Sequence, residues 1–519
     1  MKSPSSSSSF NPEVVVGELP LRCATVERVA RDAAPVRLSR EPSFRARLER
    51  GAAVIARRLE DGVPTYGVNT GFGASVRNAV PVEAALSLAQ NLPRYHGCGV
   101  GPMLSHEQSR AVLLVRASSL AAGYSGVRPV LIERMLELLA HDIVPLIPAR
   151  GSVGASGDLT PLSYVAALLA GERKAHVGAT GQVLDAREAL ALAQLTPLTL
   201  LPKESLAIMN GTSVMAALAC LACERAARLA DTACALTALC LDALAGQRRH
   251  YDARLFQAKP HPGQAHSAAR IRAFLSEREL PPPRAAAIQE RYSLRCAPHV
   301  IGVLLDVLPF CRQVLETEIN GASDNPLIDP DTGDVLHGGN FYGGHVALVA
   351  DTLKSAVANL ADLLERQVIL MNAPETNHGL PENLVAVQGG ERFAHHGYKA
   401  MEITASALTA EALKLCMPAS VFSRSTEGHN QDKVSMGTLA VQDLTQILEL
   451  TETVAAVHAM AAAQAMELRG LAHTSAPLRA LHAAIREHAA FMREDRPLDA
   501  EIVRVVQRVQ RGFGELAPD

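Results

Sequence analysis

The sequence predicts an all-α protein in which a smaller, loop-rich N-terminal region precedes a long central helical bundle. Aromatic residues make up only 4% of the 519 residues and Trp is absent, whereas strands favour aromatic and β-branched side chains. Long runs rich in Ala and Leu favour helix instead. After residue 204 several such runs approach or exceed roughly 25 residues and carry apolar side chains on more than one face, which is typical of buried bundle helices.

The N-terminal region, 21–204, follows a Ser- and Pro-rich tail, 1–20, that we expect to be disordered. Sequence periodicity predicts short strands around 177–183 and helices over 45–60, 81–92, 106–120, 129–140 and 163–170. Pro81 and Pro129 suit a first helical position, where the missing N–H costs no hydrogen bond. The three glycines within 67–73 predict a loop with unusual backbone geometry.

The central bundle, 205–475, is predicted from five long runs with helical periodicity. These runs cover 205–245, 296–320, 344–372, 394–416 and 437–470. The last segment, 476–519, is more highly charged than the bundle. We therefore expect it to form peripheral helices that pack on the outside of the bundle.

Charge, cysteine usage and hydropathy narrow the class of protein. Lys and Arg number 50 against 53 Asp and Glu, a formal net charge of −3, whereas a nucleic-acid binder needs a basic excess or patch. The odd count of nine cysteines does not fit a disulfide framework and favours a reducing, cytoplasmic location. The most apolar stretch, 210–246, is interrupted by charged residues, so we predict no membrane span and no membrane partner.

No metal site is predicted either. Cys220 and Cys223 form a C-x-x-C, but they lie in an Ala- and Leu-rich helical run without the turn residues of a zinc knuckle. The adjacent His395 and His396 lack the context of an H-E-x-x-H motif. We therefore interpret these cysteines as buried structural residues.

The glycine-rich segment 151–157 interrupts the helical pattern and is the most informative part of the sequence. Its spacing matches neither phosphate-binding loop, and the residues after Ser156 exclude a nucleophile elbow. One interpretation is a turn in which Ser156 or Asp158 caps the next helix. The other is chemical: a tight turn could press the Gly157 nitrogen onto the Ala155 carbonyl carbon, because glycine has no Cβ to obstruct it. Cyclisation with loss of two waters would then give a methylidene-imidazolone, a strong electrophile made from the chain itself.

The run GSVGASGDLTPLSY at 151–164 is similar to the signature of the aromatic amino acid lyase family. That family comprises the histidine, phenylalanine and tyrosine ammonia-lyases and related aminomutases. The similarity extends from about residue 20 to the C-terminus, and so many matches in the family's order are hard to obtain by chance. The other matching stretches are YGVNTGFG (66–73), NGTS (210–213), KPHPGQ (259–264), QERYSLRC (289–296), SDNPL (323–327), GGNF (338–341) and HNQDKVSMG (429–437).

The resemblance implies a role for each matching residue. The implied catalytic residues are Tyr66, Ala155, Ser156, Gly157, Asn210 and Tyr292, of which Ala155, Ser156 and Gly157 would form the 4-methylidene-imidazol-5-one (MIO) group. No external cofactor is implied. Tyr66 would remove a β-proton, so the site must lower its pKa of ~10 or hold the proton acceptor in place. Arg295 would bind the substrate carboxylate through its guanidinium fork. The other implied substrate-binding residues are Tyr95, His96, Gln289, Phe341, Lys399, Glu427 and Gln431.

The pair Tyr95 and His96 stands where the family selects the substrate's ring, and it departs from the usual pairs. Histidine lyases usually carry Ser-His there, tyrosine lyases often His-Leu and phenylalanine lyases Phe-Leu. His96 occupies the histidine-lyase position, yet it could also hydrogen-bond a phenolic hydroxyl. Lys399 and Glu427 follow the phenylalanine and tyrosine pattern.

We therefore expect a tyrosine ammonia-lyase that converts L-tyrosine to trans-p-coumarate and ammonia and accepts L-phenylalanine as a poorer substrate. Histidine ammonia-lyase, which yields urocanate, and tyrosine 2,3-aminomutase stay open as alternatives. The resemblance also implies a homotetramer in which each active site draws on three subunits. A catalytically inactive relative serving as a scaffold is a rival, but the intact 155–157 triad together with Tyr66 and Arg295 argues against it.

Overall fold

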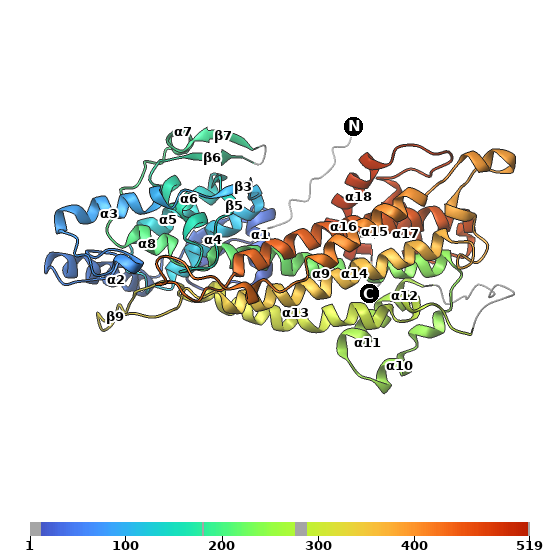
Figure 1. Cartoon of the computed structure of the whole chain (residues 1–519), viewed down its shortest axis with the longest axis horizontal. Helices are drawn as coiled ribbons and strands as arrows, with labels where there is room; N and C mark the ends of the chain where they lie inside the picture. The colour runs from blue at the N-terminus through green and yellow to red at the C-terminus, as the bar shows by residue number, and fades with distance from the viewer. Residues whose placement is uncertain (1–11, 179–180, 276–287, 517–519) are drawn as a thin grey trace. The chain divides into compact units, whose positions relative to one another are not determined.

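The computed structural model describes residues 12–178, 181–275 and 288–516. Helices dominate these residues and the strands are short, which confirms the predicted all-α class (Figure 1). The chain divides into two compact units, and each is assembled from three segments. The first contains Met1–Leu221, Arg312–Ala350 and Pro418–Gln442, and the second contains Ala222–Cys311, Asp351–Met417 and Asp443–Asp519.

The first unit is built around α4 (His106–Ala121), which is buried along most of its length. Ser105 begins this helix with a capping box, in which its hydroxyl accepts from the Gln108 N–H and the Gln108 side chain accepts from the Ser105 N–H. Both α1 (Cys23–Arg31) and α5 (Pro129–Ala140) pack against α4. The remaining short helices are α2 (Pro42–Glu60), α3 (Val82–Tyr95), α6 (Leu159–Leu169), α7 (Ala186–Leu192) and α8 (Glu204–Met209).

Short strands lie before or between helices along the chain and pair into small sheets. The strands are β1 (Val14–Val16), β2 (Val36–Leu38), β3 (Val100–Met103), β4 (Ile143–Pro145), β5 (Pro148–Arg150), β6 (Lys174–Val177), β7 (Gln182–Asp185), β8 (Leu327–Ile328) and β9 (Val335–Leu336). β1 pairs with β2 in parallel, and the other pairs, β3–β5, β4–β6, β6–β7 and β8–β9, are antiparallel. The strands expected around 177–183 correspond to β6 and β7.

The prediction of a disordered tail over 1–20 is wrong for the part that the structure describes. Residues 1–11 lie outside the described residues. Val14–Val16 form β1, in which Val14 pairs with Val36 and Val16 with Leu38. The side chains of Val14 and Val16 are buried. Three consecutive β-branched residues favour a strand, and that signal was outweighed by the polar residues before it.

Long helices form the bundle. These are α9 (Ser213–Ala243), α13 (Ala297–Asn320), α14 (Gly344–Asn372) and α16 (Gly437–Arg469), and each contributes residues to both units. The second unit also contains the shorter helices α10 (Ala253–Ala258), α11 (Pro262–Phe274), α12 (Tyr292–Arg295), α15 (Lys399–Lys414), α17 (Ala476–Arg486) and α18 (Asp499–Arg511). Their order along the chain can be followed by colour in Figure 1.

Two of the predicted long helices begin later than their sequence pattern suggests. The run 205–245 is broken between α8 and α9, where the Thr212 N–H donates to the hydroxyl of Ser323 at 3.1 Å. The run 394–416 becomes α-helical only at Lys399, because Gly397 adopts a φ of +53°. In both places tertiary contacts or a left-handed backbone override a local preference for helix.

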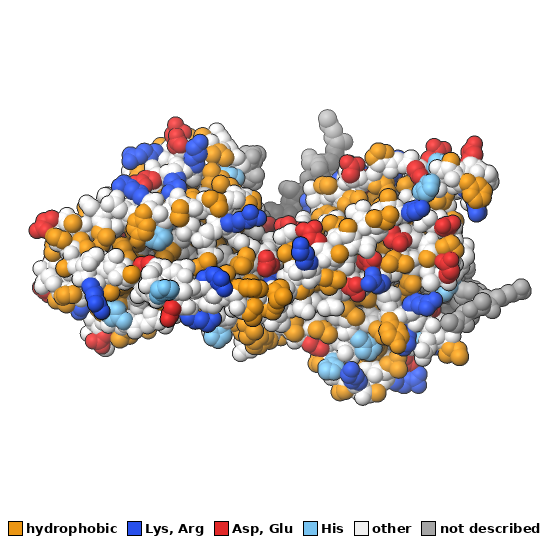
Figure 2. All heavy atoms as spheres, in the orientation of Figure 1, with side chains coloured by type: hydrophobic (Ala, Val, Ile, Leu, Met, Phe, Trp, Pro, Cys, Tyr) orange, Lys and Arg blue, Asp and Glu red, His pale blue; other side chains and the backbone are white. Residues whose placement is uncertain are grey.

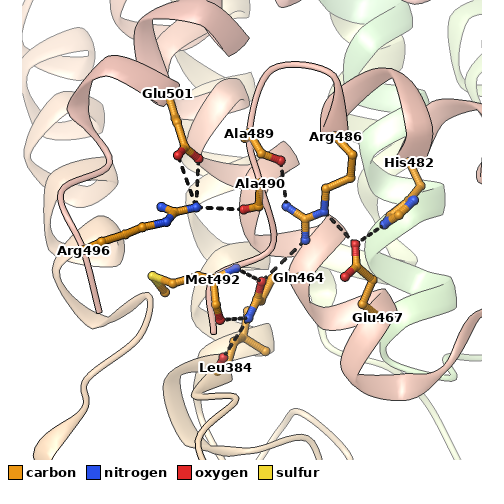
Figure 3. A network of polar contacts seen from close by, with 10 residues as sticks. All are labelled: Leu384, Gln464, Glu467, His482, Arg486, Ala489, Ala490, Met492, Arg496 and Glu501. Carbon is orange, nitrogen blue, oxygen red and sulfur yellow. Dashed lines mark hydrogen bonds and ion pairs between the residues drawn. The ribbon is translucent and has the colours of Figure 1, made fainter. Parts of the chain in front are cut away.

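A polar network joins the C-terminal helices to the end of α16 (Figure 3). Gln464 is fully buried, and its amide exchanges hydrogen bonds with the backbone of Met492, donating to the carbonyl at 2.9 Å and accepting from the N–H at 3.0 Å. Glu467 accepts from Arg486 Nε and His482 Nε2, each at 2.6 Å. The charged C-terminal segment is therefore held by specific hydrogen bonds as well as by its apolar faces.

The distribution of surface charge and the burial of the most apolar helical stretch are relevant to nucleic acids and membranes as possible partners. Figure 2 shows Lys and Arg interspersed with Asp and Glu over the described residues of the face in view. One helical stretch, Glu204–Ala243, is long and apolar enough to cross a bilayer by length and composition, and its most apolar window is entirely buried inside the protein. Such burial is what a core helix shows.

Candidate active site

The segment 151–157 forms a tight turn between β5 and α6 in the first unit. Ser156 and Gly157 adopt positive φ values of 52° and 76°. A Cβ on Gly157 would lie 2.2 Å from the carbonyl oxygen of Gly211, so only glycine fits this close approach. The next N–H, that of Asp158, donates to the same carbonyl at 2.7 Å. The turn is thus pressed against the break between α8 and α9.

The carboxylate of Asp158 holds the turn in place through three hydrogen bonds. It is fully buried and accepts from the Met215 N–H at 2.9 Å, the Ser152 hydroxyl at 3.1 Å and the hydroxyl of Thr438. Burial raises the pKa of Asp158 to about 6, and these hydrogen bonds oppose that rise. Asp158 does not cap α6 with its side chain, as one interpretation of the sequence had it; its carboxylate lies instead at the N-terminus of α9.

Two side-chain amides hold Ser156 on its exposed side. Asn210, at the end of α8, donates from Nδ2 to the Ser156 carbonyl at 2.8 Å. Gln431 donates from Nε2 to the Ser156 hydroxyl at 3.2 Å, and its Oε1 accepts from Thr426 at 2.9 Å, which orients the amide. The structure therefore brings both predicted amides onto the predicted triad.

The loop 66–73 covers the turn. The Gly73 N–H donates to the phenolic oxygen of Tyr66 at 2.9 Å, and the Ala74 N–H donates to Glu427 Oε1 at 3.2 Å. Burial and the nearby charge of Glu427 raise the pKa of Tyr66, while the bond from Gly73 opposes the rise. The pKa of Tyr66 is thus not lowered, and its phenolic oxygen is held in place by the Gly73 N–H.

Two cavities meet at these residues. The larger has a volume of about 420 Å³ and the smaller about 170 Å³. The residues that line both are Tyr66, Gly73, Ser156, Asn210 and Gln431. Ala155 and Phe341 line the larger cavity, as do Asn325 and Lys433. The smaller cavity is lined on its other side by apolar residues and by the predicted selectivity residues, namely Phe72, Leu92, Tyr95, His96, Leu159, Leu206 and Glu427.

His96 has one assigned ring nitrogen. Its Nδ1 lies 3.1 Å from the carbonyl oxygen of Leu92, so Nδ1 carries the proton and donates it there. Burial lowers the pKa of His96, so the ring is neutral near pH 7 and Nε2 is a hydrogen-bond acceptor. The Tyr95 ring contacts this ring with centroids 4.3 Å apart and planes tilted by 38°. Burial raises the pKa of Tyr95 to about 12, which keeps its hydroxyl protonated.

Five predicted site residues line neither cavity: Gly157, which is packed against Gly211 in the turn, and four residues of the second unit. Gln289, Tyr292, Arg295 and Lys399 belong to the second unit and line neither cavity. Tyr292 is 71% exposed, and the guanidinium of Arg295 lies 4.5 Å from the centroid of its ring. Lys399 is exposed at the first position of α15. The single chain therefore brings together the predicted triad, the predicted base and the predicted ring-selecting pair, whereas the predicted carboxylate-binding Arg295 lines neither cavity.

Sequence analysis did not identify two buried polar contacts in the first unit. Gly211 accepts from Asp158, and Asp324 forms a fully buried ion pair with Lys203 at 2.6 Å. The adjacent Asn325 reaches the larger cavity. Both regions lie in stretches that were matched to the family, NGTS and SDNPL, so the motifs marked the place but not the contact. Among the described residues, no group of three or more His, Cys, Asp or Glu side chains is placed to hold a metal ion.

Comparison with known proteins gives a consistent family assignment. A family model described as aromatic amino acid lyase matches residues 21–487. The chain is 40% identical over 500 residues to a histidine ammonia-lyase of Anaeromyxobacter dehalogenans, covering 95% of this chain and 97% of that protein. It is 41% identical over 478 residues to a histidine ammonia-lyase of Aromatoleum aromaticum, covering 92% of this chain and 90% of that protein.

Solved structures agree on the fold. A tyrosine aminomutase from Streptomyces globisporus matches with a TM-score of 0.90 at 32% identity, covering 97% of this chain and 98% of that chain. A histidine ammonia-lyase from Trypanosoma cruzi matches with a TM-score of 0.88 at 31% identity, covering 98% and 96%.

These relatives contradict the prediction of a tyrosine ammonia-lyase, because proteins 38–41% identical to nearly the whole chain are histidine ammonia-lyases. Lys399 and Glu427 had favoured tyrosine as the substrate, and their places in the structure bear on that inference. Lys399 lines neither cavity of its own chain, so within one chain it has no contact with the ring-binding residues. Glu427 lines the smaller cavity, and it also accepts from the backbone of Ala74, a contact that does not itself depend on the substrate's ring.

Proposed function

We propose, from the premise that this chain belongs to the aromatic amino acid lyase family and is a carbon–nitrogen lyase, that it is a histidine ammonia-lyase. It would convert L-histidine to trans-urocanate and ammonia. The observation that carries the choice of substrate is His96. Its neutral ring presents Nε2 as an acceptor at the smaller cavity, and the imidazole of L-histidine carries an N–H that can donate to it.

Discrimination follows from the same contact. A substrate without a donor at that place, such as L-phenylalanine, leaves the His96 acceptor buried and unpaired, and a site built to hydrogen-bond a substrate group rejects analogues that lack it. The smaller cavity also has apolar lining residues, among them Leu92, Leu159 and Leu206, which suit the faces of a flat ring.

The residues of the turn fit an MIO group formed from Ala155, Ser156 and Gly157. Ring closure needs the nitrogen of Gly157 to approach the carbonyl of Ala155, and the positive φ values and the lack of room for a Cβ at Gly157 support such compression. Asn210 would hold the closed ring through the Ser156 carbonyl, which stays in the ring. Gln431 contacts the Ser156 hydroxyl, which leaves as one of the two waters when the ring forms. Once formed, the group supplies an electrophile that makes the substrate's amino group able to leave.

The remaining chemistry rests on this chain's own side chains. Tyr66 removes the proton from the β-carbon of the substrate, because its oxygen is fixed at the cavity by Gly73 and borders Ser156 across the same space. Burial favours the protonated phenol, so the phenolate that removes the proton is the minor form, and the N–H of Gly73 partly offsets the cost of forming it. Arg295 binds the substrate carboxylate through its fork of N–H donors.

We further propose a homotetramer that acts in the cytoplasm. Arg295 and Tyr292 lie in the second unit and line neither cavity of their own chain, which supports a site completed by other subunits. None of the nine cysteines, all of which the structure describes, is paired in a disulfide, and such usage is typical of proteins in a reducing compartment. Sedimentation of the purified protein should give four times the monomer mass; a stable, fully active monomer would contradict the shared site.

The assay that tests the substrate offers L-histidine, L-tyrosine and L-phenylalanine separately to the purified full chain. Products are separated by chromatography, so that urocanate, coumarate, cinnamate and β-amino acids are distinguished. We expect urocanate as the main product at the highest kcat/KM. A β-amino acid as the main product would favour the aminomutase alternative, and no turnover of any substrate would favour an inactive relative.

A further inference from the structure

The short helix α12, which carries Tyr292 and Arg295, ends with a carbonyl that has lost its helical partner. The residue four positions after Leu294 is Pro298, which has no N–H to donate. The Leu294 carbonyl accepts instead from the hydroxyl of Tyr251 at 2.7 Å. The neighbouring carbonyl, that of Ser293, accepts from Gln367 Nε2 at 2.9 Å. Two side chains from distant parts of the second unit therefore complete the end of α12.

Both donors lie inside the second unit. Tyr251 and Gln367 are fully buried. The Gln367 amide also donates to the hydroxyl of Thr237 on α9 at 3.1 Å, and its Oε1 accepts from His458 Nε2 on α16 at 2.8 Å. Gln367 itself lies on α14, so three long helices meet in one hydrogen-bonded chain that ends on the backbone of α12.

The ionisation of these groups fixes the direction of each bond. Burial raises the pKa of Tyr251 far above its ordinary value, so its hydroxyl stays a donor. Burial lowers the pKa of His458 to about 3, so the ring is neutral and its single proton is on Nε2, facing Gln367. The Nδ1 of His458 is buried and has no hydrogen-bond partner among the described residues. Packing alone would not require an imidazole and an amide in this apolar setting.

The outer side of α12 carries the groups that meet the substrate in the function proposed above. Arg295 donates from Nε to the Glu290 carbonyl at 3.1 Å and lies over the Tyr292 ring. The Glu290 N–H donates to His250 Nε2 at 3.2 Å, one residue before Tyr251. The turn η2 (Arg248–Tyr251) therefore holds α12 at both ends, through Glu290 and through Leu294.

We infer that Tyr251, Gln367, Thr237 and His458 are positioning residues that set the direction of Arg295, and thereby the binding of the substrate carboxylate. The inference rests on the proposed function, in which Arg295 binds that carboxylate. Loss of one donor removes a side-chain hydrogen bond from a carbonyl of α12, and for Leu294 it leaves, among the described residues, only the N–H of Cys296, two residues later. The short helix then turns to restore the lost bond. Because a charge-assisted pair depends on geometry, Arg295 then meets the carboxylate less well.

A pair of substitutions on one helix tests this inference. Thr237→Val removes the hydroxyl that accepts from Gln367. Thr232→Val removes an equally buried hydroxyl of the same helix, one that has no hydrogen-bond partner among the described residues. Tyr251→Phe removes the donor to Leu294 directly. In the full chain we expect Tyr251→Phe to raise KM for L-histidine about tenfold and Thr237→Val several-fold, with kcat changed less than about twofold. Thr232→Val should match the wild type.

A second readout does not depend on the substrate. Amide hydrogen exchange over residues 292–297 should be faster in Tyr251→Phe and Thr237→Val, and unchanged in Thr232→Val. The mass deficit of two waters at the triad should persist in all three variants, which separates a displaced Arg295 from a failure to fold. An unchanged KM, unchanged exchange, or an equal effect of Thr232→Val would overturn the inference. If the wild type deaminates another aromatic amino acid, the proposed substrate fails, and KM for that amino acid decides the inference instead.

Discussion

Replacing His96 by leucine tests the proposed substrate at its most specific contact. The change removes the Nε2 acceptor and leaves an apolar side chain among Leu92, Leu159 and Leu206. An imidazole N–H of L-histidine then enters the cavity without a partner, which costs ~1–3 kcal/mol. Since 1.4 kcal/mol is a tenfold change, kcat/KM for L-histidine should fall by about 5- to 150-fold.

The same change should act in the opposite sense on L-phenylalanine. Its ring offers no donor, so in the wild type it leaves the His96 nitrogen desolvated and unpaired, and His96→Leu removes that cost. We therefore expect kcat/KM for L-phenylalanine to rise while that for L-histidine falls.

The assay measures initial rates with both amino acids, and His106→Leu is the control. His106 is also partly buried, lies 3.0 Å from Asp142 and lines neither cavity. An unchanged histidine-to-phenylalanine ratio in His96→Leu, or the same change in His106→Leu, would refute the role given to His96.

Three further predictions concern the residues around the turn. Asp158→Asn removes a carboxylate whose native pKa is raised to about 6, above ~3.9 in the unfolded chain. In the wild type, protonation of Asp158 stabilises the fold below about pH 4, and this stability is lost as the pH rises through about 6. The free energy of unfolding measured with urea should therefore fall by ~3 kcal/mol over that window in the wild type and not in the variant. The same dependence of unfolding free energy on pH in both proteins would contradict this prediction. Gly73→Ala places a Cβ 1.9 Å from Glu427 Oε1 at a positive φ, so we expect kcat/KM to fall at least about tenfold while backbone strain costs only ~1–2 kcal/mol; full activity would show that the carboxylate is free to move. Lys203→Met leaves Asp324 charged and buried, which should lower the free energy of unfolding by ~3–5 kcal/mol. Adding Asp324→Leu to this variant should restore much of that loss. Equal denaturation midpoints for the wild type and Lys203→Met would contradict this prediction.

The long helices could be predicted because their signal is local and repeated. The run 344–372 coincides with α14, and 437–470 ends within one residue of α16. Their apolar periodicity persists over many turns, so no single contact decides the outcome. The break at 210–212 could not be predicted in this way, because it depends on hydrogen bonds from a segment about a hundred residues later.

The chemistry of the site could be predicted where backbone geometry limits the residue type. Gly157 is such a position, since a Cβ would overlap Gly211. The choice of substrate could not be predicted, because it depends on which side chains share a cavity and on which nitrogen of His96 carries the proton. Lys399 and Glu427 match a family pattern by position, but only the structure separates a residue that lines the cavity from one that does not.

The central claim is that residues 155–157 form the electrophile of a lyase, and mass spectrometry of the purified wild-type chain tests it most directly. We predict an intact mass lower than the sequence mass by two waters, with the deficit located in the peptide that contains Ser156. The variant Ser156→Ala should have its full mass and no activity. A folded wild-type protein that deaminates its substrate at full sequence mass would contradict the claim.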